Sequence, residues 1–398
     1  MSQTPDILML GWELPPANSG GLGVACHGLA QSLARLSTHI SFALPRQLPA
    51  HIPFMDIFDH DLIGVQVTAI NSPLRPYRTA ADYSNSVPIP TQGWAQDLYQ
   101  EAFRFAEAIV RFSQTRHFDL VHAHDWMTFP AGVAASQTQG KPFIAQVHAT
   151  EYDRTGGYLD SRIADIEARS LHQADKVITV SDYTKQIVCD HYQLPAEKIT
   201  VVHNGLTPTD FQVETLRRFF PHDHLVLFVG RLTFQKGVEY FLQAAKRVLE
   251  AVPNTLFIVA GSGDLYQRHL LEAAYLGISQ RVIFTGFLRN QELSALYHAA
   301  DVFVMPSVSE PYGLVALEAI AAGVPVILSK NSGVKEVIRH AQLVDFWDIH
   351  KMAALIVQSI LFPNQAHQLN RLAQFDSQPL TWEAAAAKTL ALYHQVIA

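Results

Sequence analysis

The chain has 398 residues, of which 48% are hydrophobic and 16% charged, and its formal net charge is -7 at pH 7. This length predicts two domains of similar size, and the composition excludes an intrinsically disordered chain. The acidic balance, without a dense run of Lys or Arg, argues against a nucleic-acid partner. The two cysteines, Cys26 and Cys189, lie far apart, which excludes a disulfide framework and fits a reducing compartment.

The first residues of the chain are polar and lead straight into an apolar run. Met1–Asp6 has neither the basic start nor the sustained apolar core of a signal peptide. Elsewhere, no run of about 18 uncharged apolar residues predicts a membrane span. We therefore expect a cytoplasmic protein whose contact with membranes is at most peripheral.

Short apolar or β-branched runs alternate with longer helical patterns along most of the chain. Near-continuous apolar strands separated by helices are typical of parallel sheets that are covered on both faces. In the first half, the predicted strands are Ile7–Leu10, Ile40–Leu44, Leu62–Ile70, Leu120–His122, Phe143–Val147, Val177–Val180 and Ile199–Val202. In the second half, they are Leu225–Val229, Leu256–Ala260, Val282–Thr285, Val302–Met305 and Val324–Leu328.

The alternation breaks in a polar, strand-poor stretch at residues 205–223. We predict an α/β protein with one Rossmann-like domain over residues 1–205 and a second over residues 206–380. A helix at about residues 381–398 is expected to pack back on the first domain, and residues 52–92 to form loops that decorate that domain. Ligands bind beyond the carboxyl ends of parallel strands, so the cleft between two such facing domains is the expected site.

A glycine turn follows the predicted strand Val302–Met305 and opens a helix. Gly313 allows a tight entry to that helix and lets a ligand approach the backbone closely. The N–H groups in the first turn of a helix lack partners within the helix and favour an anion such as a phosphate. The donors that we expect to bind this anion belong to Gly313, Leu314 and Val315.

Two glutamates lie on either side of this turn. Glu318 is surrounded by apolar residues of the helix, so its carboxylate needs hydrogen-bond donors, which the paired hydroxyls of a ribose would supply. Glu310 lies in the loop before the helix, where it would meet a polar group of the same ligand. Taken singly, Glu310 would be a solvated loop acid and Glu318 a salt-bridge partner. Together with the glycine turn, they favour a binding site.

Glu310 and Glu318, with seven residues between them, resemble the hallmark of glycosyltransferase family 4, which is close to the glycogen and starch synthases. The resemblance covers nearly the whole chain and implies the GT-B fold and a transfer with retention at the anomeric carbon. It also implies that Glu310 contacts hydroxyls of the donor sugar and that Glu318 contacts the nucleotide ribose.

Two cations follow the predicted strand Leu225–Val229. Arg231 and Lys236 lie five residues apart in a glycine-containing loop before the predicted helix Val238–Leu249. Arg binds a diphosphate bidentately and Lys acts as a point charge, and the place just past a parallel strand favours this role over a surface pair. The loop resembles the Gly-Arg and Lys-Gly elements of the family, which implies that Arg231 and Lys236 neutralise the leaving pyrophosphate.

A glycine-rich run that contains Gly20 and Gly21 follows the first predicted strand. It fails the G-x-G-x-x-G dinucleotide fingerprint because residue 26 is Cys, which counts against a nicotinamide oxidoreductase. In the resembled family this run lies near the donor phosphates, which implies that Gly20 and Gly21 bind the donor. Bacterial and plant glycogen synthases carry Lys where this chain has Asn18, and they usually lack the glutamate that Glu318 supplies. Both differences favour family 4 over a glycogen synthase.

Polar residues also follow two other strands of the first half. Asp125 lies in a segment that resembles the family's His-Asp-Trp motif, and the resemblance implies a role in acceptor binding. His148 comes directly after the predicted strand Phe143–Val147. The resemblance implies that the His148 side chain contacts the sugar and that its backbone carbonyl faces the anomeric carbon.

A metal site is the alternative interpretation of His122, His124 and His148. Because 19 histidines are spread along the chain, we favour a chance cluster. The Asp-x-Asp sequence at residues 59–61 lies in the loop-rich part of the first half and fits a solvated turn. We therefore predict no essential metal and no cofactor, with a nucleotide sugar as co-substrate.

The segment Phe284–Leu288 ends another predicted strand, and we expect its backbone, up to Leu288, to frame the nucleotide base. The predicted reaction moves a sugar to a hydroxyl of a glycan, sugar or lipid-linked acceptor, with UDP-glucose as the leading donor. Two alternatives keep the same fold: an ADP-glucose-dependent enzyme like the glycogen synthases, and a sugar-nucleotide epimerase. A non-enzymatic sugar-binding module ranks last, because it would not need Arg231 and Lys236.

Overall fold

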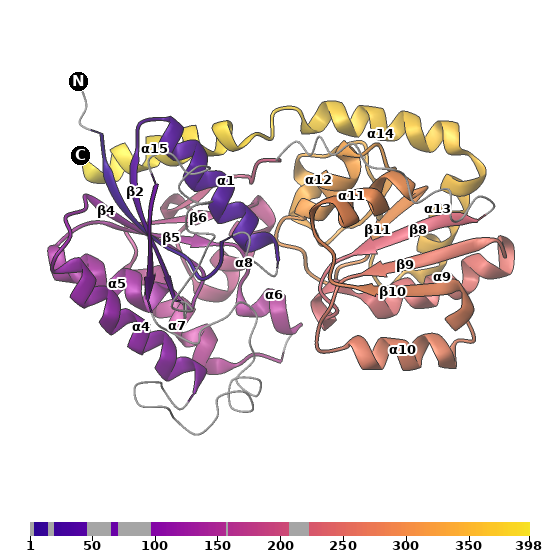
Figure 1. Ribbon diagram of the computed structural model, residues 1–398, viewed down its shortest axis with the longest axis horizontal. Helices are drawn as coiled ribbons and strands as arrows, with labels where there is room; N and C mark the ends of the chain where they lie inside the picture. The colour runs from indigo at the N-terminus through magenta and orange to yellow at the C-terminus, as the bar shows by residue number, and fades with distance from the viewer. Residues whose placement is uncertain (1–3, 15–19, 46–64, 71–96, 157, 207–222) are drawn as a thin grey trace. The chain divides into compact units, whose positions relative to one another are not determined.

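The computed structural model describes residues 4–14, 20–45, 65–70, 97–156, 158–206 and 223–398 (Figure 1). Contacts within the chain divide it into two compact units. The first contains Met1–Glu151, Leu159–Gly205 and Leu380–Ala398, and the second contains Tyr152–Tyr158 and Leu206–Pro379. Each unit is built around its own parallel sheet with helices, which confirms the predicted α/β class with two Rossmann-like domains.

The first unit holds a seven-stranded sheet in the order β3-β2-β1-β4-β5-β6-β7, and each neighbouring pair of strands is parallel. Strand β1 lies inside the sheet, and its Ile7 is opposite Ile40 of β2 on one side and Leu120 of β4 on the other. The strands are β1 (Asp6–Leu10), β2 (His39–Pro45), β3 (Val65–Ile70), β4 (Leu120–His124), β5 (Phe143–Val147), β6 (Lys176–Thr179) and β7 (Ile199–Val201). The longer helices are α1 (Gly21–Arg35), α4 (Leu98–Ser113), α5 (Phe129–Gln139), α7 (Ser161–Gln173), α8 (Asp182–Tyr192) and α15 (Trp382–Ile397).

The second unit holds a six-stranded parallel sheet in the order β10-β9-β8-β11-β12-β13. Its strands are β8 (His224–Val229), β9 (Thr255–Ala260), β10 (Val282–Gly286), β11 (Val302–Met305), β12 (Val326–Ser329) and β13 (Gln342–Val344). Its helices are α9 (Val238–Ala251), α10 (Tyr266–Tyr275), α11 (Asn290–Ala299), α12 (Leu314–Ala321), α13 (Ile349–Leu361) and α14 (Pro363–Ser377). The short helix α6 (Glu151–Thr155) spans the point in the sequence at which the chain leaves the first unit and enters the second.

The strands are apolar because helices cover the sheets, and every residue of β4 and β11 is buried. Helix α9 shows how an apolar stripe meets the sheet. Its Phe241 and Val248 are fully buried, and the Phe241 ring lies 5.5 Å from that of Phe257 on β9. Burial of a large apolar side chain contributes about 1.5–3 kcal/mol, so these stripes hold the helices in place.

In each sheet, the order in which successive strands are added changes direction beside the first strand of that sheet. Strand β1 has β2 on one side and β4 on the other. Strand β8 lies between β9 and β11 (Figure 1). Loops that leave these strands at their carboxyl ends diverge there and open a crevice, which is the usual ligand site of such sheets. Functional residues are therefore expected after β1 and β4 in the first unit and after β8 and β11 in the second.

Helix α15 returns from the far end of the sequence and packs on α1 within the first unit (Figure 1). Two glycines make room for its first residue, Trp382. A Cβ at Gly28 would lie 2.3 Å from the Trp382 ring, and a Cβ at Gly205 would lie 2.2 Å from its backbone nitrogen. The carboxyl-terminal helix is thus joined to the first unit through close packing.

Two features differ from the sequence-based expectation. Strand β13 is absent from the predicted set because it begins with Gln342 and is followed by Asp345, so it forms no apolar or β-branched run. Tyr152–Tyr158 lies in the stretch assigned to the first domain but groups with the second unit. There, Ser309 Oγ donates to Asp153 Oδ1 at 2.5 Å.

Several sequence-based expectations fall outside the described residues. They concern Asn18, the Asp-x-Asp sequence at residues 59–61, and the loops at residues 52–92 except for β3. Most of the polar break at residues 205–223 also lies outside them. Among the helices that the structure describes, none is long and apolar enough to cross a membrane.

Candidate active site

Lys236 and Glu310 form an ion pair just beyond the carboxyl ends of β8 and β11. The Lys236 Nζ atom lies 2.7 Å from Glu310 Oε2, and Ser307 Oγ donates to the same oxygen at 3.0 Å. The two charged side chains are 21% and 8% exposed. A buried ion pair adds little net stability, because the desolvation of both charges offsets their attraction. Its place at the switch point of the sheet favours a role in binding.

The loop that carries Lys236 lies directly against the loop that carries Glu310. Val308 N donates to Gln235 O at 2.9 Å and joins the two backbones. Gly237 follows Lys236 with a φ of +67°, and a Cβ there would lie 2.1 Å from the Pro306 carbonyl oxygen. Glycine is therefore required for both the left-handed conformation and the close approach.

We expect Gly237→Ala to lower the melting temperature and to weaken the binding of a nucleoside diphosphate. A strained left-handed residue costs about 1–3 kcal/mol, and the clash with Pro306 adds a displacement of the loop that positions Lys236. Gly277→Ala is the matched control, because Gly277 has a φ of +72° with nothing within 4 Å of its Cβ position. Equal losses of stability in the two variants, measured by thermal unfolding, would contradict this role of Gly237.

Backbone hydrogen bonds hold Glu310 on both sides. Glu310 N donates to Asn331 O at 2.8 Å, and Glu310 O accepts from Gly333 N at 2.9 Å. Two residues later, Tyr312 O accepts from Val334 N at 2.7 Å. These hydrogen bonds join the loop after β11 to the loop after β12. The backbone of Glu310 is therefore held in place.

Helix α12 begins after Gly313, which has a φ of +112°. Ala316 N, in the first turn, donates to Gly313 O at 3.0 Å. Within the described part of the chain, no side chain caps this end of α12, so its first N–H groups remain suited to an anion. These groups belong to the predicted donor-binding residues Gly313, Leu314 and Val315.

Glu318 lies in α12 beside Tyr297 of α11. The Tyr297 hydroxyl donates to Glu318 Oε2 at 2.9 Å, and Tyr297 itself is only 4% exposed. Burial raises the pKa of the Glu318 carboxyl to about 7, and the hydrogen bond from Tyr297 opposes this shift. Burial thus leaves this carboxylate in need of hydrogen-bond donors, which the hydroxyls of a ligand would supply. Sequence reasoning missed Tyr297, since nothing in the sequence signals that α11 faces α12.

Arg231 lies where the loops after β8 and β9 join. Gly230 N donates to Ala260 O, and Leu232 N donates to Ser262 O, both at 3.0 Å. The backbone is therefore fixed immediately before and after Arg231, which places this residue at the carboxyl end of β8. Lys236 leaves the same loop five residues later.

The end of β10 is tied to the same edge of the sheet. A Cβ at Gly261 would lie 1.8 Å from Gly230 O, so only glycine permits the approach of these two loops. Gly261 N also donates to Gly286 O, at 2.8 Å. Leu288, the residue predicted to frame the base, follows two residues after Gly286 and is partly buried.

The remaining predicted site residues belong to the first unit. Asp125 directly follows β4 with a φ of +60°, which is rare for a residue other than glycine. Its Oδ1 atom accepts hydrogen bonds from His148 N at 2.7 Å and Ala149 N at 3.4 Å. Asp125 N donates to Gln146 O at 3.0 Å. Asp125 therefore joins the ends of β4 and β5 and holds the backbone of His148.

The side chains of His148, His124, His122 and Tyr393 contact one another in that order. The Nδ1 atom of His124 is 2.9 Å from Nε2 of His148, and the His122 ring stacks on that of His124 with centroids 4.4 Å apart. The Tyr393 hydroxyl of α15 lies 2.6 Å from Nδ1 of His122. Burial lowers the pKa of His148 to about 3, so its ring is neutral at pH 7.

Gly20 and Gly21 form the entry to α1, which begins at Gly21 with Gly20 as its N-cap. Sequence reasoning missed Glu13, which is 2% exposed. Its Oε1 atom accepts a hydrogen bond from Gly23 N at 2.8 Å. This buried carboxylate satisfies one N–H group in the first turn of the helix.

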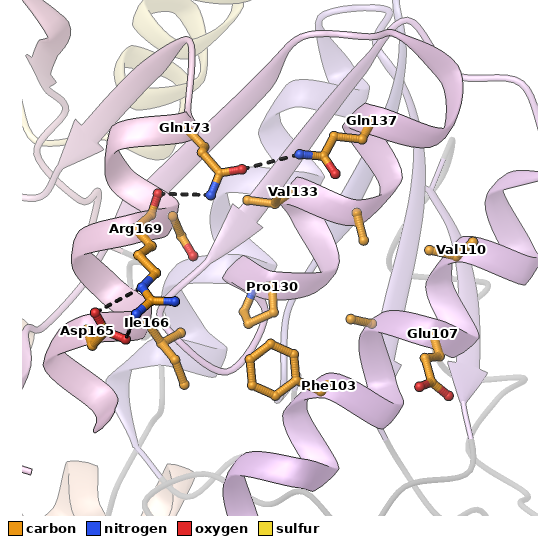
Figure 2. Close-up of a pocket in the computed structure, with 13 residues that line it drawn as sticks. Phe103, Glu107, Val110, Pro130, Val133, Gln137, Asp165, Ile166, Arg169 and Gln173 are labelled. Carbon is orange, nitrogen blue, oxygen red and sulfur yellow. Dashed lines mark hydrogen bonds and ion pairs between the residues drawn. The ribbon is translucent and has the colours of Figure 1, made fainter. Parts of the chain in front are cut away.

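A separate hollow of about 400 Å³ lies on the first unit between α4, α5 and α7 (Figure 2). Phe103, Pro130 and Ile166 line it from the three helices, and Asp165 and Arg169 form an ion pair at 2.8 Å beside it. Its lining contains none of the predicted site residues. We therefore assign it no part in the site.

Comparisons with known proteins identify the family of the chain. Residues 19–210 match Glycosyltransferase Family 4, and residues 215–374 match Glycosyl transferases group 1. An uncharacterized glycosyltransferase of Methanocaldococcus jannaschii is 34% identical over 349 residues, which are 84% of this chain and 83% of the relative. The glycogen synthase of Mycobacterium tuberculosis is 30% identical, with 97% of this chain and 94% of the relative covered.

Solved structures share the fold at lower identity. Sucrose-phosphate synthase from Thermosynechococcus elongatus has a TM-score of 0.77 at 22% identity, with 98% of both chains covered. The Anabaena protein HepE, solved with UDP and glucose, has a TM-score of 0.75 at 19% identity, with 98% of this chain and 100% of HepE covered. The family matches and the fold confirm the resemblance seen in the sequence. The chain belongs to the group 1 and family 4 glycosyltransferases, is related to the glycogen synthases, and has the GT-B fold.

Proposed function

We propose that this protein is a retaining hexosyltransferase that moves glucose from UDP-glucose to a hydroxyl of a glycan, sugar or lipid-linked acceptor. The observation that carries the proposal is the Lys236–Glu310 ion pair beside the start of α12. A cation, a carboxylate and a set of helix N–H groups at one sheet edge match the charged and hydroxyl groups of a nucleotide sugar.

Each group has a role in this proposal. Lys236 and Arg231 offset the charge of the leaving diphosphate, together with the first N–H groups of α12. Glu310 binds hydroxyls of the transferred sugar, and Glu318 binds the ribose hydroxyls beside its partner Tyr297. The bond from the anomeric carbon to the diphosphate breaks, the acceptor oxygen bonds to that carbon, and the leaving phosphate takes the acceptor proton.

In the first unit, His148 is the proposed sugar contact. Its ring is neutral at pH 7, so it binds through hydrogen bonds rather than as an acid. The hydrogen bond from His148 N to Asp125 holds the backbone whose carbonyl the family resemblance places near the anomeric carbon. Asp125 is thus proposed as a positioning residue, in addition to its proposed role near the acceptor.

Two relatives bear on the donor. HepE has been solved with UDP-glucose, which supports a UDP sugar in a protein of this fold. The 30% identity to a glycogen synthase supports an alternative donor, ADP-glucose. We favour UDP-glucose because Glu318 sets this chain apart from the bacterial and plant glycogen synthases that use ADP-glucose.

A thermal-shift panel of UDP-, GDP- and ADP-glucose tests the donor. We expect UDP-glucose to raise the melting temperature most, since a ligand that binds only the folded state stabilises it. Nucleotide release should then depend on an added acceptor and should not fall when EDTA is present. Retention would be read from the anomeric configuration of the product by NMR. Stabilisation by ADP-glucose alone would favour the glycogen synthase alternative, and conversion of the donor without an acceptor would favour an epimerase.

A further inference from the structure

Three side chains with metal-binding atoms converge in the first unit. Cys26 comes from α1, His124 is the last residue of β4, and His148 follows β5. One nitrogen or sulfur atom from each residue lies within 4.8 Å of the other two. His124 and His148 are already in contact at 2.9 Å through their ring nitrogens. The sequence alone favoured a chance group of histidines, whereas the fold adds a thiol to two of them.

The buried atoms of this cluster are incompletely paired. Cys26 and His124 are both fully buried. Among the residues that the structure describes, no partner lies within hydrogen-bond distance of His124 Nε2. A buried polar atom left without a partner costs about 1–3 kcal/mol, so its presence needs an explanation such as an ion.

The chemistry of the three donors selects the ion. A thiolate and two imidazoles are the preferred ligands of Zn²⁺, whereas Mg²⁺ and Ca²⁺ prefer oxygen. Three protein ligands leave the fourth tetrahedral position for water. Neutral imidazole is the form of histidine that binds metals.

Two carboxylates belong to residues next to the cluster. Asp125 directly follows His124 in the chain, and Glu13 accepts a hydrogen bond from Gly23 N, three residues before Cys26 on α1. Their negative charges favour a cation beside the sulfur atom. Hydrogen bonds to Gly23 N and His148 N hold Glu13 and Asp125 in place. A bound Zn²⁺ would displace the thiol proton to solvent, and the carboxylates would offset the positive charge that remains.

We propose that Cys26, His124 and His148 form a binding site for Zn²⁺. His148 is the only one of the three with exposed surface, so the ion enters along its ring. One consequence rests on the proposed function: a bound ion engages the imidazole of His148, withdraws it from the sugar and inhibits transfer. Zn²⁺ is then an inhibitor and not a cofactor of the reaction.

The test uses the full-length protein, reduced and free of metal. Co²⁺ is titrated while the thiolate-to-cobalt absorption band is followed, and Zn²⁺ affinity is measured by competition with a chromophoric chelator. We expect one Zn²⁺ per chain and a thiolate band with Co²⁺. Loss of an outer-shell partner already weakens metal binding by roughly 10- to 100-fold, so Cys26→Ala and Cys26→Ser should weaken Zn²⁺ binding by at least about 100-fold.

Cys189→Ala is the matched control, because Cys189 is the other cysteine of the chain and lies on α8. It should keep both the affinity and the cobalt band. Absence of the band in the wild type, or unchanged Zn²⁺ affinity in a folded Cys26→Ser variant, would overturn the proposal.

A rate measurement tests the inhibition of transfer separately from the binding of Zn²⁺. Zn²⁺ should inhibit donor turnover by the wild type and by Cys189→Ala, and should leave Cys26→Ser active. Binding that depends on Cys26 but does not inhibit would uphold the metal site and count against His148 as the sugar contact.

Discussion

Replacing Lys236 with methionine is expected to reduce donor turnover by about 100- to 1000-fold, the usual cost of losing one group that stabilises transition-state charge. Methionine keeps the length and apolar stem of the side chain but removes the cation. The Lys236 Nζ atom lies 2.7 Å from Glu310, at the switch point of the second sheet, where the diphosphate is proposed to bind. Initial rates of nucleotide release at saturating donor measure the loss.

The same substitution should also destabilise the protein. It leaves the Glu310 carboxylate, whose side chain is 8% exposed, without its cation. An unpaired buried charge costs about 3 kcal/mol or more. In the double variant Lys236→Met/Glu310→Gln, the charge is gone and the amide that replaces the carboxylate still lies beside Ser307. We expect denaturant unfolding to show recovered stability and the rate assay to show no recovery, which separates a structural role from a catalytic one.

The surface pair Arg268–Glu239 is the matched control in the same unit. Its atoms are 3.4 Å apart and the Arg268 side chain is 65% exposed. Such pairs contribute at most about 1 kcal/mol, so Arg268→Ala should leave both stability and turnover nearly unchanged. If Lys236→Met and Glu310→Gln both retained full activity, our assignment of the site would be wrong.

Glu318→Gln is expected to make the free protein more stable at pH 8 and to weaken its binding of the donor. The sign follows from the pKa of Glu318, which burial raises from 4.5 to about 7. At pH below about 4.5 the carboxyl is protonated in both the folded and the unfolded chain and has no effect. As pH rises to 7, the unfolded chain ionises first, so stability is lost, and the full loss persists above pH 7.

The size of this effect follows from the shift. A change of one pKa unit corresponds to about 1.4 kcal/mol, so the rise from 4.5 to about 7 predicts that the variant gains about 3 kcal/mol over the wild type at pH 8 and almost nothing at pH 4.5. Chemical unfolding at the two pH values measures the difference. Equal gains at both pH values would show that the charge of Glu318 is not the cause.

Tyr297→Phe is the matched variant for this experiment. It removes the 2.9 Å hydrogen bond to Glu318 but keeps the carboxyl group. We expect it to lose stability at pH 8, where the wild-type carboxylate relies on that donor. Donor binding by the wild type should strengthen from pH 6 to pH 8, because the ionised carboxylate accepts both ribose hydroxyls. Binding by Glu318→Gln should be weak and independent of pH over this range.

Much of the fold was predictable because a strand that is buried on both faces appears in the sequence as a run of apolar residues. The predicted strands Phe143–Val147 and Val302–Met305 match β5 and β11 residue for residue. The edge strand β13 was missed because it begins with Gln342 and is followed by Asp345, so it forms no apolar run. The pairing of residues 152–158 with the second unit rests on side-chain contacts, such as Ser309 to Asp153, that no local pattern encodes.

The position of a candidate site residue was predictable where that residue follows a strand in the chain. Glu310, Arg231 and Lys236 were identified in this way, because parallel strands deliver their following residues to one edge of a sheet. The sequence alone thus determined the class of fold, the two-domain plan and the residues that carry charge to the ends of the strands.

Only the tertiary structure decided which of these side chains meet. It placed Lys236 on Glu310 and Tyr297 on Glu318. It also brought Cys26 to the two histidines after β4 and β5. The physical reason is that hydrophobic periodicity sets which face of a helix or strand is buried, whereas the partners of a polar group depend on how distant elements pack.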